Sequence, residues 1–286
     1  MRLAPTRFHL PGEDWLFVKW YAEPSAHDAL LADHLPAVLA EIEDDVDRWF
    51  FVRYQDPEPH LRLRFHGDSQ ALNGRVLPRS AVRRVCSSRT GRCVRRLSTP
   101  TGPRRTATAA RLSRSPPSAC STDSLSAVVQ VRALRGAARA LPADVLAGLG
   151  HAVLLESLED WDWCGWVDRM FTKTDEHEVY QRHRALADRL VMPGNMVASA
   201  AEALRAPALH ALWARRATCV RAVDPFRPEA DRDEALLSLL HMRHNRQFGI
   251  DRSAEARGYA VLRGAVRSHL GRRRHGGEGA SGEGGR

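Results

Sequence analysis

Three short stretches near the N-terminus carry the residue pattern of β-strands. Residues 14–21 (DWLFVKWY) and 48–54 (RWFFVRY) are rich in β-branched and aromatic residues and are bounded by polar ones. Residues 60–67 (HLRLRFHG) follow the turn sequence QDPEP and alternate apolar with basic side chains. We therefore expect a strand at each of these three places.

Between the first two strands, apolar positions recur with helical spacing. In residues 25–43 one helix face would carry Leu30, Leu31, Leu35, Val38, Leu39 and Ile42. Ser25 and Asp28 have the spacing of a capping box at the start of this helix. Pro36 lacks a backbone N–H, so we expect it to kink the helix or split it in two.

Helical periodicity dominates the second half of the chain. It occurs in residues 145–158, 177–191, 208–220 and 232–248. Gly249 is expected to end the last of these helices, and Ser253 to cap the next one.

The predicted fold class is α+β. An N-terminal strand–helix–strand–strand sheet would pack with a mainly helical C-terminal half. We expect residues 1–270 to form a single domain. Residues 271–286 have few apolar side chains and are expected to be disordered.

Residues 79–122 differ in composition from the rest of the chain. They contain 11 Arg and no Lys, Asp or Glu, so they carry +11; the whole chain carries +9, which leaves −2 for the remainder. The basic character therefore belongs to this segment, which disfavours a basic surface for nucleic acid. A genuine basic, disordered loop of this length would be unusual in a compact domain. We expect the segment to be irregular.

The sequence lacks the usual signatures of cofactor and metal sites. The five cysteines show neither a disulfide framework nor zinc-ligand spacing, and no phosphate loop, dinucleotide fingerprint or nucleophile elbow is present. No apolar run is long enough for a signal peptide or a membrane span. We expect a cytoplasmic protein with no cofactor, no metal and no membrane contact.

Arg62 and Arg64 are the first candidate site residues. They are two residues apart on a predicted strand, so both guanidinium groups project from the same face. Such a pair can bind a carboxylate in bidentate geometry. The alternative is an ordinary solvated strand face.

A second candidate site lies near the end of the predicted helix 232–248. His241, His244, Asn245 and Arg246 fall within two helical turns. A histidine there could act as a general base, or the two histidines could bind a metal, although no third ligand has suitable spacing. The alternative is a structural histidine that is stabilised near the helix C-terminus.

Two motifs carry a resemblance to a known family. RWFFVRYQDPEPHLRLRFHG and LLHMRHNRQFGIDRSAE resemble the thiopeptide-type bacteriocin biosynthesis family, which is similar to the C-terminal, glutamate-eliminating part of class I lantibiotic dehydratases. The resemblance covers most of residues 12–270. A third family motif, Y-x-x-E-x-x-R-Y-G-G, is expected between them and is replaced here by the segment 79–122.

A change of reading frame would account for the missing motif. With permitted codons, residues 97–110 read one base out of frame can encode V-D-T-Y-R-P-E-T-D-R-Y-G-G, which fills every fixed position. Family-like sequence resumes at Asp123. Our hypothesis is that residues 79–122 are an out-of-frame translation flanked by two compensating changes.

The resemblance implies a reaction and its partners. A tRNA-dependent glutamylating partner protein esterifies Ser or Thr of a precursor peptide, and this module removes the Cα proton and expels glutamate, which leaves a dehydroamino acid. The slightly negative charge outside residues 79–122 argues against direct nucleic-acid contact, and we leave a homodimer open. We assign His241 as the base, Arg62 and Arg64 as the clamp for glutamate, and His244, Asn245 and Arg246 as supporting residues.

Two other functions remain open at this point. Relatives of the module form the pyridine of thiopeptides by a formal cycloaddition between two dehydroalanines. Alternatively, the chain is an inactive scaffold, because the Glu and Arg of the missing motif are absent.

Overall fold

The computed structural model describes ten stretches of the chain. They are residues 14–80, 95–97, 124–132, 141–158, 161–172, 177–191, 196, 211–215, 218 and 232–278. The chain divides into two compact units, the first formed by residues 1–132 with 245–250 and the second by residues 133–244 with 251–286. Each unit is described by itself.

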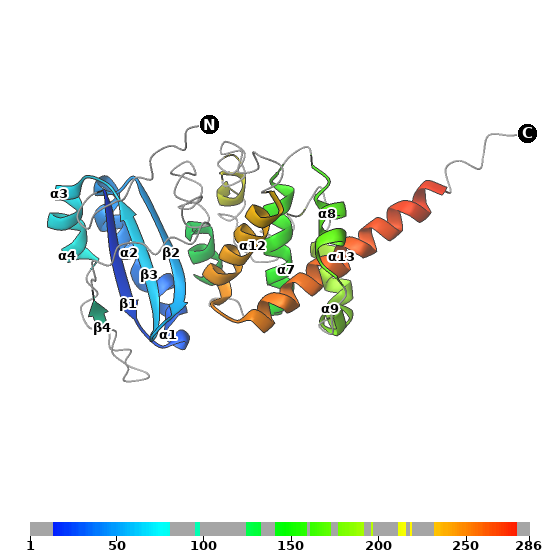
Figure 1. Ribbon diagram of the computed structural model, residues 1–286, viewed down its shortest axis with the longest axis horizontal. Coiled ribbons are helices and arrows are strands. Elements are labelled where there is room, and N and C mark those ends of the chain that lie inside the picture. Colours follow the sequence, from blue (N-terminus) through cyan, green and yellow to red (C-terminus); the bar gives the residue numbers. More distant parts are fainter. Residues whose placement is uncertain are drawn as a thin grey trace, which may run out of the picture. The chain divides into compact units, whose positions relative to one another are not determined.

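Unit 1 is built on an antiparallel sheet, shown in Figure 1. Its strands are β1 (Trp15–Tyr21), β2 (Arg48–Gln55), β3 (Pro59–His66) and β4 (Arg95–Leu97), in the spatial order β2-β3-β1-β4. The three predicted strands are confirmed as β1, β2 and β3. Their residue patterns were informative because alternation matches the pleat of a sheet with one buried face.

β4 corrects the expectation that residues 79–122 are entirely irregular. This three-residue strand pairs with residues 19–21 of β1. The pairing is made by backbone N–H and C=O groups, which the outer edge of β1 offers to any neighbouring extended segment, whatever its side chains.

A helical layer follows β1 in the sequence. It consists of α1 (Pro24–Ala29), the π-helical η1 (Leu30–His34), α2 (Leu35–Ile42) and the 3₁₀ segment η2 (Glu43–Asp45). The backbone N–H of Leu35 bonds to the carbonyl of Leu30, five residues back, so a π-helical segment interrupts the α-helical pattern just before Pro36. The helical run itself continues, so the kink or split expected at Pro36 takes this milder form. The capping-box prediction was wrong. Glu23 is the N-cap and its side chain accepts no cap hydrogen bond, and Pro24 already has the backbone angle suited to the first helical position.

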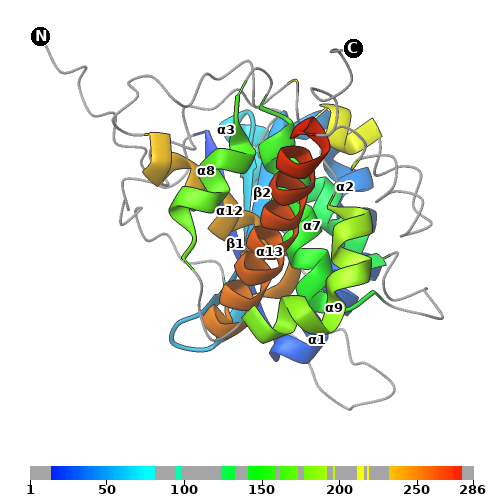
Figure 2. The ribbon, with the colours of Figure 1, turned by 90° about the vertical axis from the view of Figure 1, so that its right-hand side faces the viewer.

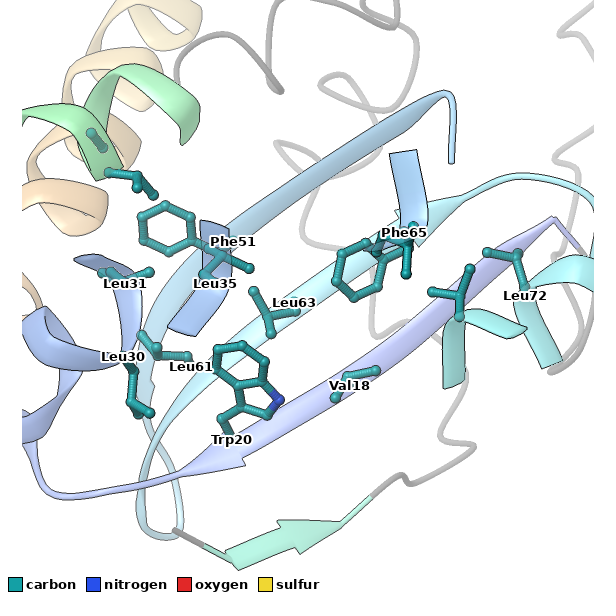
Figure 3. Packing of buried hydrophobic residues seen from close by; sticks show 14 residues of the cluster. Val18, Trp20, Leu30, Leu31, Leu35, Phe51, Leu61, Leu63, Phe65 and Leu72 are labelled. Carbon is teal, nitrogen blue, oxygen red and sulfur yellow. The ribbon is translucent and has the colours of Figure 1, made fainter. Parts of the chain in front are cut away.

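One face of the sheet and this helical layer form the core of unit 1 (Figure 3). The strands contribute Val18, Trp20, Phe51, Leu61, Leu63 and Phe65, and the helices contribute Leu30, Leu31, Leu35 and Ile42. Three short helical segments, α3 (Ser69–Ala71), η3 (Leu72–Val76) and α4 (Leu77–Arg79), close one end with Leu72 and Val76. The indole N–H of Trp20 donates to the carbonyl of Ser80 at 3.0 Å, which joins this end to β1.

The chain returns to the core of unit 1 directly after the basic segment. Residues 124–132 are helical, and Ala127 and Val128 belong to the buried cluster around the sheet. Ser124 is fully buried, and its hydroxyl accepts from the backbone N–H of Phe51 at 3.4 Å. The core therefore resumes next to Asp123. The out-of-frame hypothesis concerns mostly residues 81–94 and 98–123, and these lie outside the described residues.

Unit 2 is helical where it is described. Its long elements are α7 (Ala143–Glu156), α8 (Trp163–Met170), α9 (His177–Leu190), most of α12 (Arg232–Phe248) and α13 (Arg252–Glu278). Figure 2 shows α13 alongside α7 and α9, and it also contacts α8. The helical predictions for the second half are confirmed for residues 145–156, 177–190 and 232–248. Of the predicted helix 208–220, only residues 211–215 and 218 are described, and they are helical.

At the boundary between α12 and α13 one prediction is confirmed and another was wrong. Gly249 has φ +94°, a left-handed conformation that suits glycine, and it ends α12 as expected. Asp251, and not Ser253, caps α13, because its side chain accepts from the backbone N–H of Ala254 at 3.0 Å. Ser253 already lies inside the first turn.

The C-terminal end of α13 is longer than the sequence suggested. Residues 271–278 are helical, although residues 271–286 were expected to be disordered. Arginine is a good helix former, and the Arg272 guanidinium donates to Ser268 at 2.7 Å and to Asp188 of α9 at 3.3 Å. These contacts extend the helix beyond its apolar part. No helix in the described stretches is long and apolar enough to cross a membrane.

Candidate active site

The second face of the sheet in unit 1 carries cations and aromatic rings. Because strand side chains alternate, the residues of β3 that do not point into the core are His60, Arg62, Arg64 and His66. Their cross-strand neighbours include Phe17, Lys19 and Tyr21 on β1 and Phe50 and Tyr54 on β2, together with Trp15, Arg48 and Val52. Arg62 and Arg64 therefore share a face, as the sequence predicted.

Arg64 is held between two rings. Its guanidinium carbon lies 4.1 Å from the ring centre of Phe17 and 5.5 Å from that of Phe50. Burial and the nearby Arg62 lower the pKa of Arg64 to about 10, so it still carries a positive charge at neutral pH. This environment is not the solvated strand face of the alternative interpretation.

Arg62 is fixed by a ring and by a histidine. Its guanidinium carbon lies 3.3 Å from the ring centre of Tyr54, and its Nε donates to Nε2 of His60 at 3.0 Å. Within the described stretches, neither Arg62 nor Arg64 forms an ion pair with a carboxylate. Two positive charges without an acidic partner form a site that favours an anion.

His66, at the far end of β3, already has acidic partners. Its Nδ1 lies 2.6 Å from Asp47 and its Nε2 3.3 Å from Asp14. Because His66 has two carboxylate partners, unlike Arg62 and Arg64 within the described stretches, we leave it out of the candidate anion site.

His241 is the candidate base, and in unit 2 it is paired with an acid. Its Nδ1 lies 3.0 Å and 3.1 Å from the two carboxylate oxygens of Glu255, and the Tyr259 hydroxyl donates to Glu255 at 2.7 Å. The hydrogen bond to Glu255 raises the pKa of His241. Burial opposes ionisation of Glu255, but the hydrogen bonds from His241 and Tyr259 outweigh it and lower its pKa. The ionised carboxylate accepts the Nδ1 proton, which leaves Nε2 as the nitrogen able to take a proton.

His244 has a different environment from His241. Its ring is buried and stacks parallel to His151, with 6.0 Å between ring centres. Burial lowers the pKa of His244, so it is neutral at physiological pH. The described residues contain no group of three or more His, Cys, Asp or Glu side chains that could hold a metal ion.

Asn245 and Arg246 belong to unit 1 and contact β2. The Asn245 amide accepts from the N–H of Arg53 and donates to its C=O, both at 2.9 Å, and Arg246 Nε donates to the carbonyl of Phe51 at 3.1 Å. β2 is an outer strand, so these side chains satisfy backbone groups on its free edge. These hydrogen bonds thus go to β2, whereas both residues were expected to support the base.

Arg53 makes further contacts between β2 and the end of α12 within unit 1. Its buried guanidinium donates to the carbonyls of Arg246 and Gln247 at 3.1 Å and 3.0 Å and pairs with Asp28 at 2.7 Å. A cation at the last carbonyls of a helix is favourable, because that end carries partial negative charge.

Sequence reasoning missed three residues of these sites. Glu255 and Tyr259 are four apart on α13 and meet on one helix face, a spacing that the sequence offered but that we did not connect with His241. His60 was given no role, although it is two residues from Arg62 on the predicted strand and residues two apart on a strand share a face.

Comparison with known proteins identifies the family of the chain. A family model described as the C-terminal part of the lantibiotic biosynthesis dehydratase matches residues 15–266. The chain belongs to this family. It is 42% identical over 67 residues to the subtilin biosynthesis protein SpaB of Bacillus subtilis and 36% identical over 58 residues to the nisin biosynthesis protein NisB of Lactococcus lactis subsp. lactis. These matches cover 23% and 20% of this chain but only 6% of each relative.

Two solved structures resemble the fold. The tRNA-dependent lantibiotic dehydratase MibB from Microbispora sp. 107891 matches with a TM-score of 0.74 and 25% identity, over 96% of this chain and 29% of its own length. The pyridine synthase TbtD from thiomuracin biosynthesis matches with a TM-score of 0.57 and 14% identity, over 91% and 99% of the two chains. At that identity the second likeness concerns the fold alone. The family membership confirms the resemblance and places the chain in peptide natural-product biosynthesis.

Proposed function

We propose that this chain eliminates glutamate from glutamylated Ser or Thr residues of a precursor peptide. The observation that carries the proposal is the pairing of His241 with Glu255, which leaves Nε2 as the proton-accepting nitrogen. The family membership and the likeness to a tRNA-dependent lantibiotic dehydratase support it. The precursor peptide and a tRNA-dependent glutamylating protein are then the partners, and a homodimer is a further assembly to test.

His241 takes the proton in this reaction. Nε2 removes the Cα proton, the C–H electron pair becomes the Cα=Cβ double bond, and the Cβ–O bond breaks as glutamate leaves with its carboxylate restored. Glu255 stabilises the imidazolium that forms, because the same contact raises the pKa of His241. A raised pKa also means that the base must first lose its proton, so the rate is expected to rise with pH.

Arg62 and Arg64 bind the departing glutamate. Negative charge develops on the leaving carboxylate as the Cβ–O bond lengthens, and fixed guanidinium groups stabilise that charge without reorganising. Their contacts with Tyr54, Phe17 and Phe50 hold them in place before the substrate arrives. The lack of a carboxylate ion-pair partner within the described stretches supports this role.

The missing third motif bears on the activity of the chain as written. In the out-of-frame hypothesis its Glu and Arg would be encoded across Pro103/Arg104 and Thr106/Ala107, which lie outside the described residues. Without these two side chains we expect a slow enzyme. The function should therefore be tested with the chain as written and with a version in which the frame is restored across residues 79–122.

The decisive experiment uses a synthetic precursor peptide carrying a glutamyl ester on one serine. Mass spectrometry would follow the loss of glutamic acid from the peptide. In the restored-frame protein, Arg64→Ala and His241→Ala should abolish elimination and leave the glutamylated peptide unconsumed. Arg75→Ala and His183→Ala, at exposed or half-buried positions elsewhere, serve as matched controls. Normal dehydration by the His241 or Arg64 variant would refute the assignment of that residue.

The same assay separates the alternatives. Consumption of a linear peptide containing two dehydroalanines, with no effect on the glutamyl ester, would indicate pyridine formation instead. Binding of the peptide without consumption of either substrate, in both versions of the protein, would indicate a scaffold.

A further inference from the structure

The imidazole of His60 occupies a closed position in unit 1. The residue is fully buried, although it lies on the cationic face of the sheet defined by Lys19, His60, Arg62 and Arg64. Tyr21 and Tyr54, its cross-strand neighbours on β1 and β2, flank the ring with 4.9 Å and 5.5 Å between ring centres. Its orientation is therefore fixed from both sides.

The two ring nitrogens of His60 have complementary partners. Nδ1 lies 2.6 Å from the backbone carbonyl of Glu58, which can only accept, so Nδ1 carries the proton. Nε2 then has a free lone pair and accepts the N–H of Arg62 Nε at 3.0 Å. Burial, followed by the positive charges of Arg62 and Lys19, lowers the pKa of His60, whereas the Glu58 carbonyl and Asp56 act in the opposite direction. The ring is neutral in this arrangement.

This contact determines which part of Arg62 remains available. The hydrogen bond uses Nε, and Tyr54 covers one face of the guanidinium plane. Within the described stretches the two terminal NH2 groups have no hydrogen-bond partner, so they can bind the oxygens of a carboxylate side by side. An arginine side chain otherwise has many rotamers, so the contact also reduces the freedom that ligand binding would have to remove.

We propose that His60 is a positioning residue that holds the Arg62 guanidinium in the orientation that receives a carboxylate. That the carboxylate is the leaving glutamate rests on the function proposed above. The contact between His60 and Arg62 can be tested without that function.

Two substitutions of His60 separate its two hydrogen bonds. In His60→Gln the amide oxygen can reach the position of Nε2 and accept from Arg62. In His60→Asn the shorter amide can reach only the position of Nδ1, so it keeps the bond to Glu58 and loses the one to Arg62. His34→Asn, on the half-buried His34 of η1, is the control for a histidine-to-asparagine change elsewhere in unit 1.

The direct readout is the Nε–H signal of Arg62 in ¹⁵N-resolved NMR spectra of the full chain, assigned by its loss in Arg62→Lys. We expect this proton to exchange slowly with water in the wild type, His60→Gln and His34→Asn, and to exchange rapidly in His60→Asn. An unchanged exchange rate in His60→Asn would overturn the proposal. If that variant does not fold, the His60 ring of the wild type is measured instead. We expect its ¹⁵N spectrum to show the proton on Nδ1, and a proton on Nε2 would also overturn the proposal.

Elimination by the restored-frame protein gives the second readout. We expect His60→Asn to be slower by roughly 10- to 100-fold, the scale associated with misplacing a binding group, and His60→Gln to recover most of the rate. Equal rates in the Asn variant and the wild type would contradict the positioning role. If the Arg62 signal responds as expected but the wild type eliminates no glutamate, the positioning role stands and the proposed function fails.

Discussion

The side-chain amide of Asn245 forms with Arg53 the pair of hydrogen bonds that a neighbouring β-strand would form. Its oxygen accepts the Arg53 N–H and its nitrogen donates to the Arg53 carbonyl, each at 2.9 Å. The two residues are 192 positions apart in the sequence, and this side chain closes the outer edge of the sheet at Arg53, beside the contacts of Ser124 and Arg246 with Phe51. The consequence is structural, although Asn245 lies within the motif that suggested catalysis.

Replacing Asn245 should therefore lower stability. In Asn245→Ala both backbone groups of Arg53 lose their partner in a buried place, and the free energy of unfolding should fall by about 2–4 kcal/mol. Urea unfolding measures this change. Asn73→Ala, which removes an exposed amide bonded to the Ser69 carbonyl at 2.8 Å, is the control and should change stability by no more than about 0.5 kcal/mol. Equal effects of the two substitutions would contradict the edge-closing role.

Two glycines on α13 should respond oppositely to alanine. A Cβ on Gly264 would collide with the ring of Tyr180 on α9, whereas nothing lies within 4 Å of a Cβ on Gly271. Gly264→Ala should therefore cost about 1–3 kcal/mol of stability, the usual penalty of overpacking. Gly271→Ala should add about 0.5–1 kcal/mol, because alanine favours the helix. Thermal unfolding of both variants tests this, and a neutral Gly264→Ala would mean that α9 and α13 are less closely packed than described.

The His241–Glu255 pair predicts a pH dependence of stability. His241 has a raised pKa when folded, so its contribution is complete below its unfolded value of 6.5 and is lost as pH rises through the folded pKa. Glu255 has a lowered pKa, so its contribution is complete above 4.5 and is lost as pH falls through the folded pKa. Glu255→Gln should therefore reduce the melting temperature most between pH 4.5 and 6.5.

The same pair predicts a shift in the pH profile of catalysis. The elimination rate should rise with pH as His241 loses its proton, and Glu255→Gln should move this rise to lower pH because the pKa of His241 falls. An NMR titration of the His241 ring measures the pKa independently. A rate profile that stays in place while the titration moves would show that His241 is not the base.

Restoring the reading frame tests the origin of residues 79–122. Resequencing the gene over these codons comes first, since an uninterrupted frame encoding the third motif would show that the recorded sequence is in error. If the recorded bases are correct, a recoded gene carrying that motif should increase elimination by about 100-fold or more, because a missing charged group in such a site commonly costs that much. No gain in rate would leave the scaffold as the better description.

The sequence predicted local structure better than long-range contacts. β1, β2 and β3 were predictable because alternation along a strand reports which face is buried. The partnership of Asn245 with Arg53 depends on how distant segments meet, and no periodicity encodes it. Glu255 is 14 residues from His241 across a turn, so the pair emerges only when the start of α13 is placed beside α12. The start of α1 was misplaced because Pro24 and a capping box compete within two residues of each other.

The return of the chain to the core at Ser124 has a consequence for how the protein could be divided. Every described core contact of unit 1 is made by residues before position 81, after position 123 or in 245–250. The hydrogen bond between Phe51 and Ser124 therefore does not require an unbroken chain between these two residues. Two polypeptides cut within residues 98–123 should remain associated as a complemented pair, with the second fragment supplying the serine that completes the edge of β2.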